Sequence, residues 1–185
     1  MRAFLNRLRR RVANALLYRI VFGERGRPYS RIAPSTCIEG EAGLDLGDHV
    51  FIGQFNFLDA TAGLKIGEGV QIANFVSIVT HSSHRSIRLL GRKYATHQGM
   101  APGYVRAPIS IGDYSFIGPH SLIEAGAKIG RGCVICAYSQ VRGEVPDFAI
   151  VSGQPAKVIG DVRERDAELL KQHPELTAHY KELFE

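Results

Sequence analysis

Aliphatic residues recur along this chain at every sixth position. The longest series consists of Ile111, Ile117, Ile123, Ile129, Ile135 and Val141. Earlier series consist of Ile32, Ile38 and Leu44, of Leu46, Ile52, Leu58 and Leu64, and of Ile66, Ile72 and Ile78. An amphipathic helix would repeat its apolar stripe about every 3.6 residues, and antiparallel strands would place turn signals roughly every eight to twelve residues. The period of six therefore excludes both arrangements.

The period instead predicts short flat strands joined by corners. The residue after each aliphatic one is often glycine or another small residue, and glycine permits positive φ at a corner. Three strands would form a coil of about 18 residues, and stacked coils would lie about 4.8 Å apart. We therefore predict an all-β solenoid, a parallel β-helix, with small bulges where the phase slips by two residues at Leu44/Leu46 and Leu64/Ile66.

The repeat is interrupted once. It stops at Ile78 and resumes at Ile109, which leaves a polar insertion over residues 80–108. A loop of this length inside a compact repeat is usually either functional or disordered. The insertion contains His81, His84 and His97, so it is a candidate functional segment.

Segments of a different character flank the repeat. Apolar residues spaced by four predict a helix over residues 1–22, and Asp161 to Glu185 is predicted to be helical, with Pro174 starting a second short helix. The expected organisation is a basic amphipathic N-terminal arm (1–31), a hexapeptide-repeat β-helix (32–160) and a C-terminal helical extension (161–185).

The positive charge of the chain is concentrated in the first of these segments. The net charge of +5 combines nine arginines and one acidic residue in residues 1–31, a local charge of +8, with −3 over the remainder. A mildly acidic body argues against nucleic acid binding. Residues 1–22 fit either an interfacial helix on anionic lipid or a helix packed across the end of the β-helix or on another subunit.

Cysteine content and hydropathy bear on the compartment. Cys37, Cys133 and Cys136 cannot form a disulfide framework, and the Cys-x-x-Cys pair lies inside the repeat, which favours structural thiols in a reducing compartment. The apolar stretch over residues 12–22 is broken by polar residues, so it fits neither a signal peptide nor a membrane span. We expect a cytoplasmic protein, at the inner face of the membrane if the first helix binds lipid.

Three local motifs accompany the repeat, and with it they resemble a known family. The motifs are FIGQFNFLD over residues 51–59, SIVTHSSH over 77–84 and SGQPAKVI over 152–159. The chain resembles the left-handed β-helix acyltransferases, and more narrowly the maltose, galactoside and nodulation-factor O-acetyltransferase branch. The resemblance implies a left-handed coil, although the general rule for parallel crossovers favours the right hand. It also implies acetyl-CoA as acyl donor, no metal, and a homotrimer with active sites between subunits.

Two features depart from the pattern of that branch. The N-terminal segment does not resemble the helical region where the branch carries an acceptor-binding carboxylate. The histidine of the second motif is followed by Ser-Ser, where the branch usually has proline. Both departures bear on the identity of the acceptor.

His81 is the candidate general base. It lies where the repeat opens into the insertion, and a neutral imidazole can take a proton from a hydroxyl so that the oxygen attacks a thioester directly. His84 is the fallback base, and Asp59 is expected to orient the histidine or to bind the acceptor. By family likeness, the backbone N–H of Ser139 is the candidate donor to the oxyanion.

Further residues are candidates for substrate binding. Gln54 and Asn56, with His84, are candidates for the acceptor site, although Asn56 could equally cap a corner of the coil. Phe116 and Tyr138 are candidates to flank pantetheine, unless they pack on a neighbouring subunit. Lys157 and Arg163 are candidate cations for the phosphates of coenzyme A, unless they are simply solvated.

The predicted function is acetyl-CoA-dependent O-acetylation of a saccharide hydroxyl, and the expected acceptor is a cell-surface polysaccharide or its precursor. Alternatives are a sugar N-acetyltransferase of the same fold and a γ-carbonic-anhydrase-like zinc enzyme using His81, His84 and His120. A non-catalytic binding scaffold is the third, although such a scaffold has no need of a long histidine-bearing loop.

Overall fold

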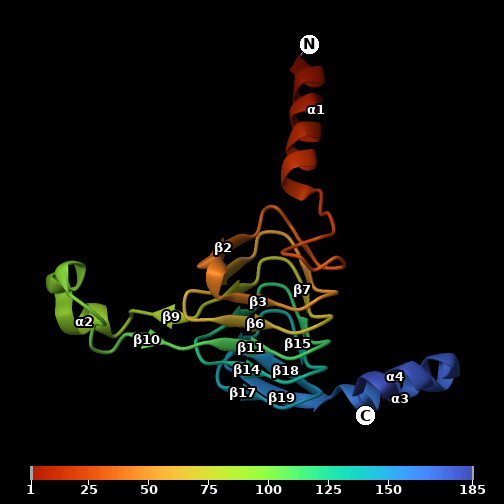
Figure 1. Ribbon diagram of the computed structural model, residues 1–185. Helices are drawn as coiled ribbons and strands as arrows, with labels where there is room; N and C mark the ends of the chain where they lie inside the picture. Colours follow the sequence, from red (N-terminus) through yellow and green to blue (C-terminus); the bar gives the residue numbers. More distant parts are fainter. Residues whose placement is uncertain (1, 185) are drawn as a thin grey trace.

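The computed structural model, which describes residues 2–184, is a left-handed parallel β-helix of triangular cross-section (Figure 1). The first sheet contains β1 (Arg31–Ile32), β4 (Phe51–Ile52), β7 (Gln71–Ile72), β12 (Phe116–Ile117), β15 (Val134–Ile135), β18 (Ala149–Gly153) and the antiparallel β19 (Ala156–Asp161). The second contains β2 (Cys37–Glu39), β5 (Phe57–Asp59), β8 (Ser77–Ile78), β13 (Leu122–Ile123) and β16 (Gln140–Val141). The third contains β3 (Leu44–Leu46), β6 (Leu64–Ile66), β11 (Ile109–Ile111), β14 (Lys128–Ile129) and β17 (Glu144–Val145). The predicted fold class is confirmed.

The core is a set of aliphatic ladders that run down the inside of the three sheets. In the first sheet, Ile52 pairs with Ile72, and Ile72 pairs with Ile117 in the next coil. These three side chains are fully buried. The period of six therefore places one aliphatic side chain of each strand in the interior, at the same height as its partners in the neighbouring coils.

The predicted bulges at the phase slips are wrong. Strands β3 and β6 pair in unbroken register, and Leu44 and Leu46 both point into the core because alternate residues of one strand share a face. The two extra residues of these coils are taken up at the corner before the strand, where a short 3-10 turn (Glu41–Gly43) lies. The shift of two residues in the aliphatic series is therefore due to a longer corner between the second and third sheets.

The insertion leaves the solenoid at the corner between the second and third sheets. Its base is an antiparallel pair of β9 (His81–Ser82) and β10 (Val105–Arg106), closed by a hydrogen bond of 3.0 Å from the N–H of Ala107 to the carbonyl of Thr80. Beyond this pair it carries α2 (Ser86–Leu90) and a 3-10 segment (Gly91–Thr96), and it projects from the side of the coil stack (Figure 1).

Helical segments lie at opposite ends of the stack. The first helix, α1 (Arg2–Ala13), continues as a π-helical segment (Asn14–Tyr18) and ends there, so the predicted helix to residue 22 is too long. After the last strand come α3 (Val162–Gln172), a 3-10 turn (Pro174–Leu176) and α4 (Thr177–Phe184). Residues 1 and 185 of the two terminal segments lie outside the described residues.

Candidate active site

The base of the insertion brings a histidine against a buried carboxylate. Asp59 ends β5 in one coil, and His81 begins β9 where the next coil opens at the same corner. The Nδ1 atom of His81 lies 2.7 Å from Oδ2 of Asp59. The Asp59 side chain is wholly buried, whereas 35% of the His81 side chain is exposed. One partner is thus fixed inside the protein and the other reaches solvent.

Asp59 remains ionised because two threonines satisfy its oxygens. Its Oδ1 accepts hydrogen bonds from the N–H (2.8 Å) and hydroxyl (2.6 Å) of Thr61, and its Oδ2 accepts the corresponding bonds, also 2.8 and 2.6 Å, from Thr80. Burial by itself would raise the pKa of this carboxyl, but the four hydrogen bonds outweigh burial and hold its pKa far below the usual value. A buried charge therefore faces the histidine.

The charge on Asp59 dictates the tautomer of His81. A carboxylate can only accept hydrogen bonds, so the Nδ1 atom in contact with it must carry the proton. The neutral imidazole then has its lone pair on Nε2, on the side away from Asp59. The ring also stacks on Tyr104, with centroids 5.8 Å apart and planes 12° from parallel. His81 is therefore an oriented base with a free Nε2.

A pocket of about 570 Å³ opens beside this histidine. Its polar lining consists of His81, Ser82, His84, Arg85, Glu124 and Arg142. Glu124 is already engaged, because Nε of Arg142 lies 2.8 Å from its Oε2 and the side chain of Gln140 donates to its Oε1. The pocket has room for part of a small substrate, and its walls come from the insertion and from the two coils that follow it.

The insertion that forms one wall of the pocket is positively charged. Residues 80–108 contain no acidic residue and five basic ones, namely Arg85, Arg88, Arg92, Lys93 and Arg106. Such a concentration of one sign of charge beside a cleft raises the local concentration of anionic ligands. The chemistry of the insertion thus fits a donor that carries phosphate groups.

Four further residues hold the pair of His81 and Asp59, called the dyad below, in place, and none of them was predicted as a site residue from the sequence. Thr61 and Thr80 supply the hydrogen bonds to Asp59, and Tyr104 supplies the stacking surface for His81. The guanidinium of Arg106, opposite His81 in the β9–β10 pair, donates to the carbonyl of Thr61. Thr80 had a usable signal, since it directly precedes the histidine where the repeat breaks; Tyr104 and Arg106 had none, because their pairing depends on the closure of a long loop.

Two predicted acceptor residues lie at another corner of the triangle. Gln54 and Asn56 fall between β4 and β5, at the corner of the first and second sheets, whereas Asp59 comes at the following corner. Asn56 is buried, donates from Nδ2 to the carbonyl of Gly53 at 2.9 Å and accepts at Oδ1 from the N–H of Val76 at 2.7 Å. It caps a corner of the coil, which is one of the two alternatives expected for it, and it is not among the residues that line the pocket of His81 in this chain. Gln54 shares that corner, so it does not line the His81 pocket in this chain.

The structure contradicts the predicted oxyanion donor. Ser139 is buried, and its N–H points along the stack to Oγ of Ser121 in the coil before, at 3.4 Å. An N–H that faces the neighbouring coil at a buried residue does not face a substrate oxygen at the surface. A small residue occurs at this position because the interior of the coil is narrow, and small residues occur at the equivalent positions of the other coils for the same reason.

The predicted coenzyme A residues do not gather around His81 in one chain. Phe116 lies on the outer face of the first sheet, and Tyr138 lies in an aromatic stack with His120 at the corner of the first and second sheets. Arg163 is paired with Asp161 at 2.6 Å and lies over the ring of Phe148. Lys157 is exposed on β19. Arg163 is thus already neutralised, and the other three stay candidates only for a site that a second subunit completes.

The remaining histidines bear on the zinc alternative. His84 lines the same pocket as His81, with Nδ1 2.8 Å from Oγ of Ser82, so it stays a candidate for acceptor contact. His120 instead stacks between Phe75 and Tyr138 at a different corner. Within residues 2–184, no three His, Cys, Asp or Glu side chains form a cluster that could hold a metal ion.

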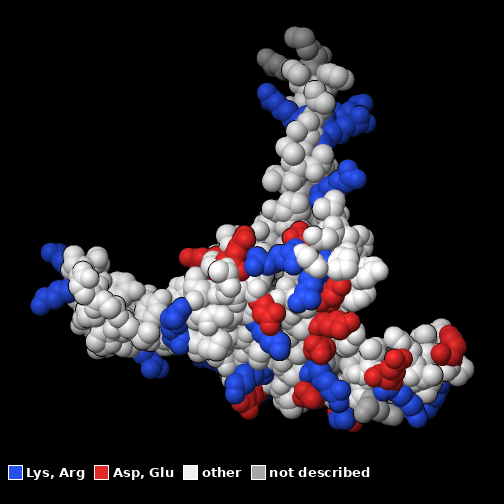
Figure 2. Space-filling model, in the orientation of Figure 1, with Lys and Arg blue, Asp and Glu red and all other residues white. Residues whose placement is uncertain are grey.

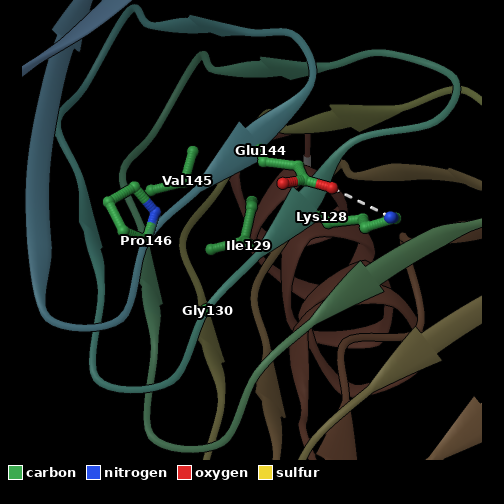
Figure 3. Close-up of a pocket in the computed structure, with 6 residues that line it drawn as sticks. All are labelled: Lys128, Ile129, Gly130, Glu144, Val145 and Pro146. Atoms are coloured by element: carbon green, nitrogen blue, oxygen red, sulfur yellow. Dashed lines mark hydrogen bonds and ion pairs between the residues drawn. The ribbon is translucent and has the colours of Figure 1, made fainter.

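A second hollow lies on the third sheet near its far end (Figure 3). Its charged side chains, Lys128 and Glu144, pair with each other at 2.9 Å across neighbouring coils, and the other four lining residues are Ile129, Gly130, Val145 and Pro146. The two charged side chains neutralise each other and are largely exposed, and the rest of the lining has no polar side chain. The hollow is a shallow groove between coils and has no oriented pair of the kind that His81 and Asp59 form.

Fold and site together define a hexapeptide-repeat solenoid with an oriented histidine where the coil opens. The family model "Bacterial transferase hexapeptide (six repeats)" matches residues 108–143. A putative acetyltransferase of Bacillus subtilis, YvoF, is 31% identical over 133 residues, covering 65% of this chain and 74% of that protein. The chain belongs to the hexapeptide-repeat acetyltransferase family.

Other relatives differ in the acceptor that their names give. The galactoside O-acetyltransferase of Escherichia coli is 33% identical over 105 residues, covering 56% of this chain and 46% of that one. Serine acetyltransferase 4 of Arabidopsis thaliana is 31% identical over 150 residues, covering 81% and 39%. The chain thus spans less than half the length of these two proteins. The crystal structure of a hexapeptide-repeat-containing acetyltransferase from Vibrio cholerae superimposes with a TM-score of 0.62 at 26% identity, over 84% of this chain and 80% of that one.

Proposed function

We propose that this protein is an acetyl-CoA-dependent O-acetyltransferase that acts on a saccharide hydroxyl. The observation that carries the proposal is the contact of 2.7 Å between His81 and the buried, ionised Asp59 at the mouth of a pocket. This arrangement provides a base for a hydroxyl group without a covalent acyl-enzyme. Membership of a family of acetyltransferases supports the thioester donor.

The reaction then follows from the atoms of the dyad. Nε2 of His81 takes the proton of the acceptor hydroxyl while the hydroxyl oxygen attacks the thioester carbonyl. Asp59 stabilises the imidazolium that forms, as the carboxylate of a catalytic triad does. When the C–S bond breaks, the thiolate of coenzyme A leaves and takes the proton from Nε2, which returns His81 to its starting state.

The donor and acceptor are supported by different features. The five basic side chains of the insertion suit the phosphates of coenzyme A, and the named E. coli relative acts on galactosides. The serine acetyltransferase relative makes serine the principal rival acceptor, also through a hydroxyl, and an amino sugar is the N-acetyl alternative. A cytoplasmic role on a cell-surface polysaccharide or its precursor, and a homotrimer that completes the site, stay predictions.

Release of coenzyme A thiol, measured with a panel of neutral saccharides, amino sugars and serine, tests the proposal. We expect turnover with a saccharide and a drop of about 10²–10⁴-fold in kcat for His81→Ala, the usual contribution of a general base. His173→Ala is the matched control, because the side chain of His173 lies exposed after α3, where it pairs with the exposed Glu175, and it is not part of the His81 pocket. Unchanged turnover in His81→Ala would refute the base, and turnover with serine alone would refute the saccharide.

A further inference from the structure

Residues 2–22, called the arm below, present an apolar stripe that the rest of the described chain, up to residue 184, leaves exposed. The stripe consists of Phe4, Leu5, Leu8, Val12, Leu16 and Leu17, whose exposed fractions lie between 43% and 69%. Within the described chain, no side chain of residues 4–17 takes part in a hydrogen bond, an ion pair or a ring contact. Figure 1 shows α1 extending away from the coil stack at the end where β2 and β3 are labelled. Large apolar side chains left in water in this number indicate a partner.

The same helix is strongly basic. The arm contains six arginines and no acidic residue. Around a helix of about 3.6 residues per turn, Phe4, Leu8 and Val12 share one face, while Arg7 and Arg11 lie along one border of it and Arg9 along the other. Figure 2 shows only basic charge on the visible face of the arm, whereas acidic side chains gather on the body.

We propose that the arm binds the surface of an anionic bilayer and lies in its plane with the stripe buried among the acyl chains. An apolar face bordered by arginines is the pattern of an interfacial helix, because the side chains of the face insert while the guanidinium groups meet lipid phosphates. The proposal goes beyond the acetyl transfer and does not depend on it.

The observations favour a bilayer over other occupants. A nucleic acid would be bound by the arginines alone and would leave the stripe in water. A second arm packed stripe to stripe would bring two sets of six arginines together without a countercharge in either arm. A transmembrane position does not fit, because no helix among residues 2–184 is both long and apolar enough to span a bilayer.

The connection between the arm and the solenoid contains two glycines at which the direction of the arm can change. Residues 23–30 form a short turn structure before β1, and Gly23 and Gly26 adopt positive φ angles of 101° and 77° with open space around each. The pocket of His81 opens on the side of the stack and not at its end, so a lipid-bound arm leaves the pocket accessible.

Vesicle flotation with the whole chain tests this proposal. The probes are vesicles of phosphatidylcholine alone and of phosphatidylcholine mixed with phosphatidylglycerol. We expect at least about tenfold more protein bound to the anionic vesicles, and a loss of roughly fivefold for each arginine changed in Arg10→Gln and Arg11→Gln. Raised salt should weaken the binding in the same direction.

The apolar face is tested with Leu8→Glu and Leu16→Glu combined, which should reduce binding by at least about tenfold. Leu169→Glu on α3 is the matched control, because it is an equally exposed leucine on another helix and should bind as wild type. Turnover of a soluble acceptor is expected to be unchanged in all these variants. Equal binding to both kinds of vesicle, binding to neither, or a fall in oligomer mass in the double variant without any vesicle binding by wild type would each overturn the proposal.

Discussion

At the scale of single residues, five hydrogen bonds offset the free-energy cost of burying the Asp59 carboxylate. A buried carboxylate without partners would become protonated, but four donors from Thr61 and Thr80 and the Nδ1–H of His81 all point at it. Each threonine contributes both its backbone N–H and its hydroxyl, so the corner itself is built around the charge. In the proposed reaction Asp59 is therefore a positioning residue, which acts through His81.

Replacing Asp59 with Asn should separate positioning from binding. The amide nitrogen of Asn can donate to Nδ1, which favours the tautomer with the proton on Nε2 and removes the lone pair from the reacting side. We expect kcat to fall by about 10²–10⁴-fold while the KM for acetyl-CoA changes by less than about threefold. Initial-rate measurements on both parameters check this, and a rise in KM with an unchanged kcat would contradict it.

The same variant has a signature in stability against pH. Because folding lowers the pKa of Asp59, its ionised form stabilises the native state above the unfolded value of 3.8, and that stabilisation is lost as pH falls toward the lower native pKa. The difference in free energy of unfolding between wild type and Asp59→Asn should therefore shrink below about pH 4. Denaturant unfolding at a series of pH values measures it.

The sequence predicted that His81 and Asp59 belong to one site, and the structure brings them into contact. It also assigned Asn56 and Gln54 to that site, where the structure does not place them, and the reason is physical. His81 stands where the aliphatic series breaks, and a break in a strict repeat is visible without any structure. Asn56 is only three residues from Asp59, yet in a triangular coil three residues are enough to pass from one corner into the next sheet. Sequence proximity therefore does not imply a shared site in this fold. Ser139 was misassigned for a different reason, because the sequence does not show that its N–H faces the preceding coil.

At the scale of elements, the solenoid and the insertion depend on each other very little. The parallel ladder continues past the insertion, because Val79 donates to the carbonyl of Ile123 at 2.9 Å and Ile109 donates to that of Gly63 at 3.0 Å. The period of six predicted the strands, but it carries no information about residues 80–108, where the β9–β10 pair and the Tyr104 stack arise from loop closure.

Shortening the insertion should therefore remove activity and keep the fold. Ser82 and Val105 are paired across β9 and β10, so residues 83–104 can be replaced by Asn-Gly, the preferred two-residue hairpin turn. We expect a melting temperature within about 5 °C of wild type, because the aliphatic ladders are untouched. We expect kcat/KM to fall by at least about 10²-fold, because Tyr104 and the walls of the pocket are lost.

Circular dichroism and thermal melting, with coenzyme A release on the same samples, provide the measurement. Wild-type turnover in the shortened protein would show that the dyad is active without residues 83–104, the part of the insertion between β9 and β10. Loss of the β-sheet signal would show instead that the insertion supports the coil stack.

At the scale of the whole molecule, the chain contains two positively charged regions and a negatively charged remainder. Residues 1–31 carry +8, residues 80–108 carry +5, and the rest of the chain carries −8. The coil stack and the C-terminal helices together thus repel anions, while the insertion that carries His81 attracts them. The net charge of +5 conceals this division, which is why composition alone says little about where an anionic ligand would bind.

This division predicts a salt dependence that is specific to the phosphates of the donor. The Debye length falls from about 30 Å at 0.01 M salt to about 10 Å at 0.1 M, so attraction between the insertion and acetyl-CoA should weaken over that range. We expect kcat/KM for acetyl-CoA to fall by about three- to tenfold, with most of the change in KM. A short acetyl thioester of N-acetylcysteamine, which lacks the phosphates, should show little change under the same conditions. An equal salt effect on both donors would mean that the basic side chains of the insertion act on the acceptor or on the fold, and not on the donor.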